Sequence, residues 1–437
     1  MSREHTLTVR AADPLAEITV YDGAFKRVGR GVGRYAGSLP DGLYEVRARV
    51  GGAVEEKLIS LDRDLPVEFG RVAFSSAIPL AQTATGDATH QAAVTRASQA
   101  PLKLGAGSGL LVVVRDRPGR EPPAASGSPA SGLSLVGPGG DRILAVGVAA
   151  PVDVTGPTPV AAVCLEVTPG VYRLRLDLPN GGARERTLVA SPGWTTQCFA
   201  VRRRFRDHAV ADLDQAAVSL DRLGRPFSPN DMRMRLAEGA RDALANNRQV
   251  ANAAAEALMR EKFQDPMLGL LVAHLLLRDR PQDPVFAVVL QNLIQLLGKD
   301  HPDVRAIALG TPQDTLGKPI ADMPMLRASW DRVVRQSLTY PNLVPANSLA
   351  GQVSTRVLPS APWLVWEPAD APSRRVDSKM AALRSYLRHS AEAPPPGAQL
   401  AMAPSRAVLD LDDREELTRS LGVPSSVLDD MLSKLGG

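Results

Sequence analysis

The chain has 437 residues, which is enough for about two to four domains. Its 51 basic and 47 acidic residues leave a net charge of only +4, which argues against a dedicated nucleic-acid-binding protein. There are two cysteines, Cys164 and Cys198, and no CxxC pair, which excludes a disulfide-rich scaffold. We expect both as buried free thiols, with a single bridge between adjacent strands as the alternative.

The N-terminal end predicts a cytoplasmic protein without membrane insertion. Met1–His5 leads directly into a strand-like stretch at Thr6–Arg10, and no apolar signal-peptide region follows. The longest apolar run, Met267–Leu277, falls short of the roughly 20 residues that a membrane helix needs.

One phrase occurs twice and indicates a duplicated β-module. Leu39–Arg47 reads LPDGLYEVR, and Val167–Arg175 reads VTPGVYRLR, so Tyr44 matches Tyr172. The match continues across a turn, where Leu58-Ile59 corresponds to Leu188-Val189. Pro and Gly bend the chain, and the following Tyr can bury its ring while its hydroxyl bonds nearby backbone.

Residues 1–70 form the first module, in which short stretches of alternating apolar and polar residues predict antiparallel strands. The pattern Pro-x-Gly-hydrophobic-Tyr-x-hydrophobic resembles the prealbumin-type sandwiches, including the carboxypeptidase regulatory-like and PEGA-type modules. The second copy lacks the spacer between Pro169 and Gly170. The resemblance implies a fold and a binding or spacer role, not chemistry.

Gly29–Arg34 is rich in glycine but lacks the spacing of a dinucleotide or phosphate loop, so it predicts a hairpin. Residues 71–108 are expected to form a linker or a strap over the first module, with a helix at 88–98. The second module, 109–201, contains a disordered insertion at 118–132. Its expected strands are Leu110–Arg115, Leu133–Val136, Ile143–Val148, Val160–Val167, Val171–Leu178, Arg184–Val189 and Gln197–Val201.

Residues 207–340 predict a helical array, because apolar residues recur at helical spacing. Asp265-Pro266 and Asp283-Pro284 each place a capping acceptor before a proline at the first helical position. His274 is expected as a hydrogen-bonded core histidine. The expected helices are 210–223, 229–246, 249–262, 266–278, 284–297, 302–309 and Trp330–Leu338.

Residues 341–390 combine an extended aromatic segment with a helix at Ser378–His389. The segment is apolar enough to pack along the body, and the alternative is a surface groove in which Trp363 or Trp366 anchors a partner. A Pro-rich linker at 391–404 tethers a helical hairpin at 405–437.

The hairpin contains helices at Asp412–Leu421 and Ser425–Leu435, with Ser425 as a possible cap. Its first half resembles a helix-turn-helix, but Asp429 and Asp430 would face phosphates with the wrong charge. We expect it to dock on a protein partner or back on the body. Its apolar stripe consists of Val427, Leu428, Met431, Leu432 and Leu435.

The fold class is therefore multidomain α+β: two N-terminal antiparallel β-sandwich modules, an all-α helical array and a tethered C-terminal helical hairpin. The sequence shows no catalytic motif and no cofactor or metal spacing. It predicts a non-enzymatic interaction scaffold or adaptor in a bacterial cytoplasm.

Two alternatives remain. The layout resembles bacterial proteins that accompany caspase-like peptidases as companions or substrates, with cleavage expected at 118–132 and 391–404. The basic run Arg202–Arg206 and the tail could instead serve a nucleic-acid regulator, although a solvated interdomain edge is the simpler interpretation of that run.

Overall fold

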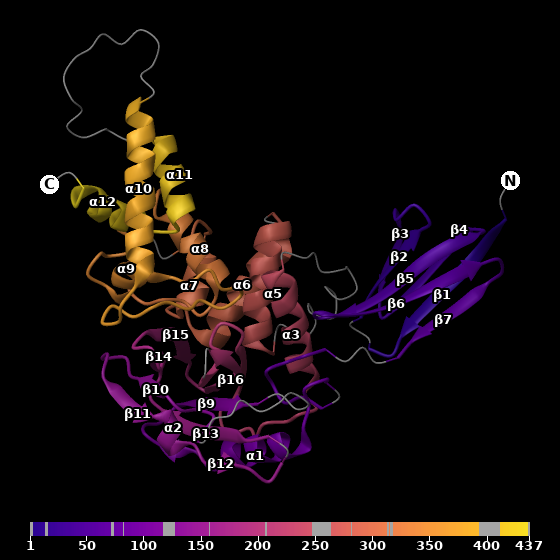
Figure 1. Ribbon diagram of the computed structural model, residues 1–437, viewed down its shortest axis with the longest axis horizontal. Coiled ribbons are helices and arrows are strands. Elements are labelled where there is room, and N and C mark those ends of the chain that lie inside the picture. The colour runs from indigo at the N-terminus through magenta and orange to yellow at the C-terminus, as the bar shows by residue number, and fades with distance from the viewer. Residues whose placement is uncertain are drawn as a thin grey trace, which may run out of the picture.

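The structure, a computed structural model, describes residues 3–13, 16–70, 74–81, 83–116, 127–156, 158–205, 208–246, 264–280, 282–312, 314, 318–392 and 411–435. Strands dominate the first half of the chain and helices the second half, so the α+β prediction is confirmed (Figure 1). None of the helices in these ranges is long and apolar enough to cross a lipid bilayer.

The first module is a seven-stranded sheet that stands to one side of the molecule (Figure 1). Its strand order is β6-β5-β2-β3-β4-β1-β7, and only Val32 and Arg34 pair between β3 and β4, on either side of Gly33. The expected hairpin at Gly29–Arg34 is thus confirmed. The strands are β1 (Glu4–Ala11), β2 (Glu17–Asp22), β3 (Arg27–Val32), β4 (Arg34–Pro40), β5 (Gly42–Val50), β6 (Ala53–Leu61) and β7 (Leu65–Phe69).

The repeated phrase adopts the same local structure twice. The Tyr44 hydroxyl donates to the Pro40 carbonyl at 2.8 Å, and the Tyr172 hydroxyl donates to the Thr168 carbonyl at 2.9 Å. Both rings are buried, as expected. The sequence match aligned Leu58 with Leu188, but the strand pairing does not. Tyr44 pairs with Ile59 and Tyr172 pairs with Leu188, so Ile59 is the structural counterpart of Leu188.

The second module consists of two sheets that share one hydrophobic core. One has four strands in the order β11-β10-β14-β15, and the other runs β12-β13-β9-β16-β17, with β8 on β13 and β18 on β16. The strands are β8 (Leu102–Lys103), β9 (Ser108–Arg115), β10 (Leu133–Val136), β11 (Arg142–Ala145), β12 (Val152–Asp153), β13 (Val160–Val167), β14 (Gly170–Asp177), β15 (Ala183–Ala190), β16 (Trp194–Phe205), β17 (His208–Ala211) and β18 (Ala217–Arg222).

Strand β9 is buried on both faces. Leu110, Val112 and Val114 face the core of the second module, whereas Leu111 and Val113 belong to a second core that continues into the first sheet. Helix α1 (Ala88–Gln99) and the segment 74–81 contribute to this second core, which confirms the expected helix at 88–98. Helix α1 packs against β13 and β9, so this part of the expected strap lies on the second module and not over the first. Arg115, fully buried, donates to the carbonyls of Ser76, Ala77 and Thr85 and so holds the strap in place.

The helix predicted over 210–223 is wrong, because this stretch forms β17 and β18. Strand β18 pairs with β16, and its residues alternate between the two cores: Val218 and Leu220 face one, and Ala217 faces the other. The strand predicted at Ile143–Val148 also ends early, at Ala145, where the single turn α2 (Val146–Ala149) begins.

The helical body follows the predicted capping signals closely. Asp265 accepts from Leu268 N at 3.0 Å and Asp283 from Val285 N at 2.9 Å, with proline at the start of each helix. The predicted helix at 249–262 lies outside the described residues. The described helices of the body are α3 (Met232–Ala245), α5 (Pro266–Asp279), α6 (Pro284–Leu297), α7 (Pro302–Ala308) and α8 (Arg327–Gln336).

The C-terminal part contains α9 (Leu349–Val353), the 3-10 turn η1 (Ser354–Arg356) and three longer helices. These are α10 (Arg374–Glu392), α11 (Leu411–Leu421) and α12 (Ser425–Ser433), which gather at one end of the molecule (Figure 1). The expected insertion at 118–132 and linker at 391–404 lie mostly outside the described residues, with only 127–132 and 391–392 inside them.

Candidate functional site

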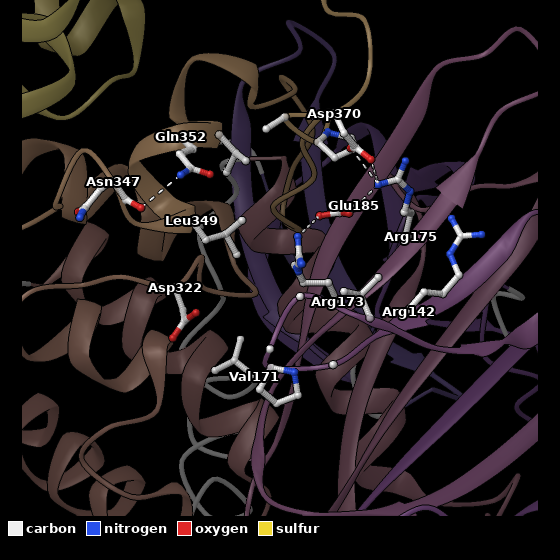
Figure 2. Close-up of a pocket in the computed structure, with 18 residues that line it drawn as sticks. Arg142, Val171, Arg173, Arg175, Glu185, Asp322, Asn347, Leu349, Gln352 and Asp370 are labelled. Atoms are coloured by element: carbon white, nitrogen blue, oxygen red, sulfur yellow. Dashed lines mark hydrogen bonds and ion pairs between the residues drawn. The ribbon is translucent and has the colours of Figure 1, made fainter.

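A cavity of about 590 Å³ lies between the four-stranded sheet and the C-terminal part of the chain. We call it the interface pocket. Figure 2 shows arginines from the sheet on one side and residues of the C-terminal segments on the other. Its lining consists of Val136, Gly137, Pro138, Gly139, Gly140, Arg142, Val171, Arg173, Arg175, Glu185, Asp322, Asn347, Leu349, Gln352, Val353, Pro368, Ala369 and Asp370.

The pocket forms because the extended segment after α9 pairs with the edge of the sheet. Glu185 on the edge strand β15 exchanges two backbone hydrogen bonds with Trp366, at 2.9 Å and 3.0 Å. An exposed strand edge is a surface for unwanted association, and this pairing covers part of it. It also carries Pro368–Asp370 over the arginines of β14.

Arg175 and Asp370 form an ion pair between the two walls, and further ion pairs order the arginines within the sheet. Arg173 donates to Glu185 at 2.8 Å, and Arg175 donates to Asp177 at 2.8 Å and to Asp370 at 2.8 and 2.9 Å. Burial disfavours the charged form of Arg175, but its bonds to Asp177 and Asp370 outweigh this and raise its pKa. Burial likewise disfavours the Asp177 carboxylate, yet the bonds from Arg175 and Arg142 lower its pKa.

The lining balances its charges. Arg142, Arg173 and Arg175 stand against three carboxylates, those of Glu185, Asp322 and Asp370. None of the described lining residues is a Ser, Thr, Cys, Lys, His or Tyr, so the ionisable groups of the lining are its arginines and carboxylates. The amides of Asn347 and Gln352 complete a polar surface suited to holding a ligand.

Both tryptophans proposed as anchors are fully buried, which confirms that the aromatic segment packs along the body. Trp363 lies under the guanidinium of Arg186, 5.0 Å from the ring centre, and Trp366 belongs to the core around Trp330. A partner cannot reach either ring in this conformation. Burial also lowers the pKa of Arg186, which donates to the carbonyl of Leu213.

The stripe of the tail packs on the chain itself. Val427, Leu428 and Met431 are buried and Leu432 and Leu435 partly so, in a cluster that includes Leu383 of α10. Ser425 does not cap its helix as expected, because it bonds Ser337 through both its amide and its hydroxyl. The hairpin thus docks in cis here, and docking of this stripe on a partner stays a prediction.

Other residues named in the sequence analysis are buried in the fold, where they form hydrogen bonds or ion pairs or remain free thiols. His274 bonds Ser329 Oγ at 2.8 Å, as expected for a core histidine, and burial lowers its pKa to about 3. Cys164 and Cys198 are free and buried, also as expected. Arg202 is buried and donates to both carboxylate oxygens of Asp116, so the basic run does not present this charge to a ligand.

The pocket arginines were not predicted as a site. Arg173 and Arg175 alternate along β14 with the buried Tyr172, Leu174 and Leu176, so the sequence does place them together on one face. Nothing in the sequence indicates that this face is covered by residues near 370.

No protein-family model matches this sequence, and the comparison with curated proteins finds no match. Among solved structures, a DUF3823 family protein from Parabacteroides merdae is similar at 9% identity, over 51% of this chain and 82% of that protein. The TM-score is 0.15, so this likeness carries no argument about function.

Proposed function

We propose that this protein is a non-enzymatic interaction scaffold and that the interface pocket receives a polar segment of a protein partner. One observation supports this most directly: the pocket combines amides with charges, and two of its three carboxylates, Glu185 and Asp370, are already paired with Arg173 and Arg175. Such a lining suits recognition by hydrogen bonds rather than bond cleavage.

The walls of the pocket are held on a fixed platform. Trp194 Nε1 donates to the Leu296 carbonyl of α6 at 2.9 Å, and Thr187 Oγ1 donates to the Met323 carbonyl at 2.7 Å. These bonds tie β15 and β16 to the helical body. A ligand that enters a prearranged pocket loses less free energy to ordering of the protein.

Because three arginines and three carboxylates line the pocket, the fitting occupant carries both charges or neutral amides. A peptide segment with mixed polar side chains meets this requirement, and its backbone can also bond the turn at Gly137–Gly140. In this scheme the β-modules and the helical body form the platform, and the hairpin at 405–437 is the docking element.

The family of the two β-modules is also part of this proposal. The matching tyrosine bonds at Tyr44 and Tyr172 support two sandwiches of the prealbumin-like or carboxypeptidase regulatory-like (PEGA-type) kind. We place the scaffold in a bacterial cytoplasm on the grounds given by the sequence. No specific contact favours a peptidase companion, and the pairing of Arg202 with Asp116 weighs against the nucleic-acid regulator.

A pocket-filling variant tests the proposal. Gln352→Trp adds volume at an exposed lining residue, and Gln291→Trp makes the same change on the exposed face of α6, outside the pocket. Full-length tagged proteins are used to recover partners from extracts of the producing cells. We expect at least one partner to be lost with Gln352→Trp and kept with Gln291→Trp. Identical partner sets for both folded variants would refute docking at this pocket.

A further inference from the structure

A second cavity, of about 260 Å³, lies on the outer face of the first sheet. We call it the arginine groove. Its lining consists of Glu17, Thr19, Tyr21, Arg27, Arg30, Arg47 and Arg49. The lining of this groove therefore has four arginines and one carboxylate, whereas that of the interface pocket has three arginines and three carboxylates. An excess of positive charge in a concave site attracts an anionic ligand.

The pleat of three neighbouring strands brings these side chains together. In β2 and β5 the residues Ile18, Val20, Val46 and Ala48 are buried, so the residues between them face outward. Thr19 pairs with Arg30 of β3 on one side and with Arg47 of β5 on the other. The groove is thus built on the sheet and not on a loop.

The carboxylates near the groove do not satisfy all four arginines. Glu17 lies opposite Arg49 in the strand register, but its side chain accepts from Arg30 at 2.6 Å instead. Arg47 is held by Glu45 at 2.6 Å and Glu56 at 3.2 Å, with its guanidinium 5.0 Å from the centre of the Tyr21 ring.

Arg27 and Arg49 are the two arginines that remain. Neither forms an ion pair or a side-chain hydrogen bond with any residue in the described ranges. Each therefore presents a guanidinium fork, which matches the geometry of a carboxylate.

We propose that the arginine groove binds a short acidic peptide segment of a partner protein, through carboxylates that pair with Arg27 and Arg49. Arg27 on β3 lies opposite Tyr21 of β2, and Arg49 on β5 lies opposite Glu17 of the same strand, so the two arginines are four residues apart along the sheet. Carboxylates four residues apart in an extended peptide are separated by about 13 Å, which matches that offset along the strands. The volume suits a few side chains and not a large ligand, since pockets for drug-sized molecules begin at about 300 Å³.

The charge distribution favours a peptide over a nucleic acid. Residues 3–70 contain ten basic and eleven acidic residues, so the module has no broad positive field. Glu17, Glu45 and Glu56 flank the groove, and a phosphate backbone running across the sheet would meet them. This site lies on a different module from the interface pocket, and its test does not require that pocket to bind anything.

Fluorescence anisotropy with the full chain tests the proposal. The probe is a labelled peptide of alternating Ser and Glu, and a peptide of Ser and Gln is its neutral counterpart. We expect salt-sensitive binding of the acidic peptide only, and a dissociation constant raised about tenfold in the double variant Arg27→Gln/Arg49→Gln. Since these two arginines have no ion-pair or side-chain hydrogen-bond partner among the described residues, the variant should unfold at an unchanged temperature.

The matched control is Arg10→Gln/Arg63→Gln, which removes the same charge from two exposed arginines of the same module. The control should bind the acidic peptide as the natural chain does. Equal affinities for all three proteins, or an equal loss in both variants, would overturn the proposal. A single-stranded oligothymidylate that binds more tightly than the peptide, through Arg27 and Arg49, would overturn the assignment to a peptide.

Discussion

Arg175 Nη1 donates to both carboxylate oxygens of Asp370, at 2.9 Å and 2.8 Å, although 195 residues separate the two in the sequence. This contact joins β14, which carries the second copy of the repeated phrase, to the C-terminal segment. It lies beside a second pair, Arg173 with Glu185, which is far more buried. Because the two ion pairs differ in exposure, we expect them to contribute different amounts to the free energy of unfolding.

Asp370→Asn should lower the free energy of unfolding by about 0.5 kcal/mol, because the Asp370 side chain is 65% exposed and solvent screens the pair. Glu185→Ala should cost about 3 kcal/mol, because the Glu185 side chain is 2% exposed and its loss leaves Arg173 without its buried partner. Denaturant unfolding of both variants measures the difference. Similar costs would mean that side-chain exposure does not set the strength of these two ion pairs.

The repeated tyrosine bond predicts a small, matched effect in both modules. Tyr44→Phe and Tyr172→Phe remove only the hydroxyl that donates to Pro40 or Thr168, so each should cost about 1 kcal/mol. Tyr44→Ala and Tyr172→Ala should cost about 3–5 kcal/mol, because they also leave a cavity. Thermal unfolding measures these costs, and partner binding per folded molecule should not change. Selective loss of binding in an equally stable variant would contradict a structural role.

The extent to which the sequence predicted this structure differs between local and distant contacts. The Asp-Pro signals at 265 and 283 located α5 and α6 to within a residue, since capping depends on neighbouring positions. The stretch 217–222 was misread as helical because Val210, Leu213, Ala217 and Leu220 recur at helical spacing, although Val218-Ser219-Leu220-Asp221 also alternates as a strand does. The interface pocket depends on the contact between Arg175 and Asp370, and no local sequence pattern predicts a contact between residues so far apart in the chain.

Titration of His274 should make stability fall in mild acid. The pKa of His274 is lowered from 6.5 to about 3, first by burial and then by Arg332 and Arg335. Between these values the unfolded chain binds the proton and the folded chain does not, so the free energy of unfolding decreases as pH falls through this window. Asp265, whose pKa burial raises to about 6, acts in the opposite direction.

Comparison with His274→Gln isolates the histidine, because the contribution of Asp265 is common to both proteins. The stability advantage of the natural chain over the variant should shrink by roughly 3 kcal/mol from pH 7 to pH 4 and stay constant above pH 7. Denaturant unfolding across this range measures it. A difference that does not change with pH would show that His274 titrates alike in both states.

The two thiols should be unreactive until the protein unfolds. Cys198 is fully buried and Cys164 is 7% exposed. Burial raises both pKa values, that of Cys164 to about 11, and the thiolate is the reactive form. Iodoacetamide at neutral pH should modify neither residue in the native chain and both in denaturant, as followed by mass spectrometry. Rapid native alkylation of Cys164 would contradict its place in the core that continues into the first sheet.

The cis docking of the tail predicts a local effect on hydrogen exchange. Leu428 is fully buried between α10, α11 and α12, so Leu428→Ala should weaken the packing by about 2–4 kcal/mol. Because the tail is joined to the body through a small cluster, it should open without global unfolding, and its amides should exchange faster while those of α5 do not change. Leu411→Ala is the matched control, since that side chain is 83% exposed. Exchange in α12 that is already fast in the natural chain would contradict cis docking and would favour a hairpin that is free to bind a partner.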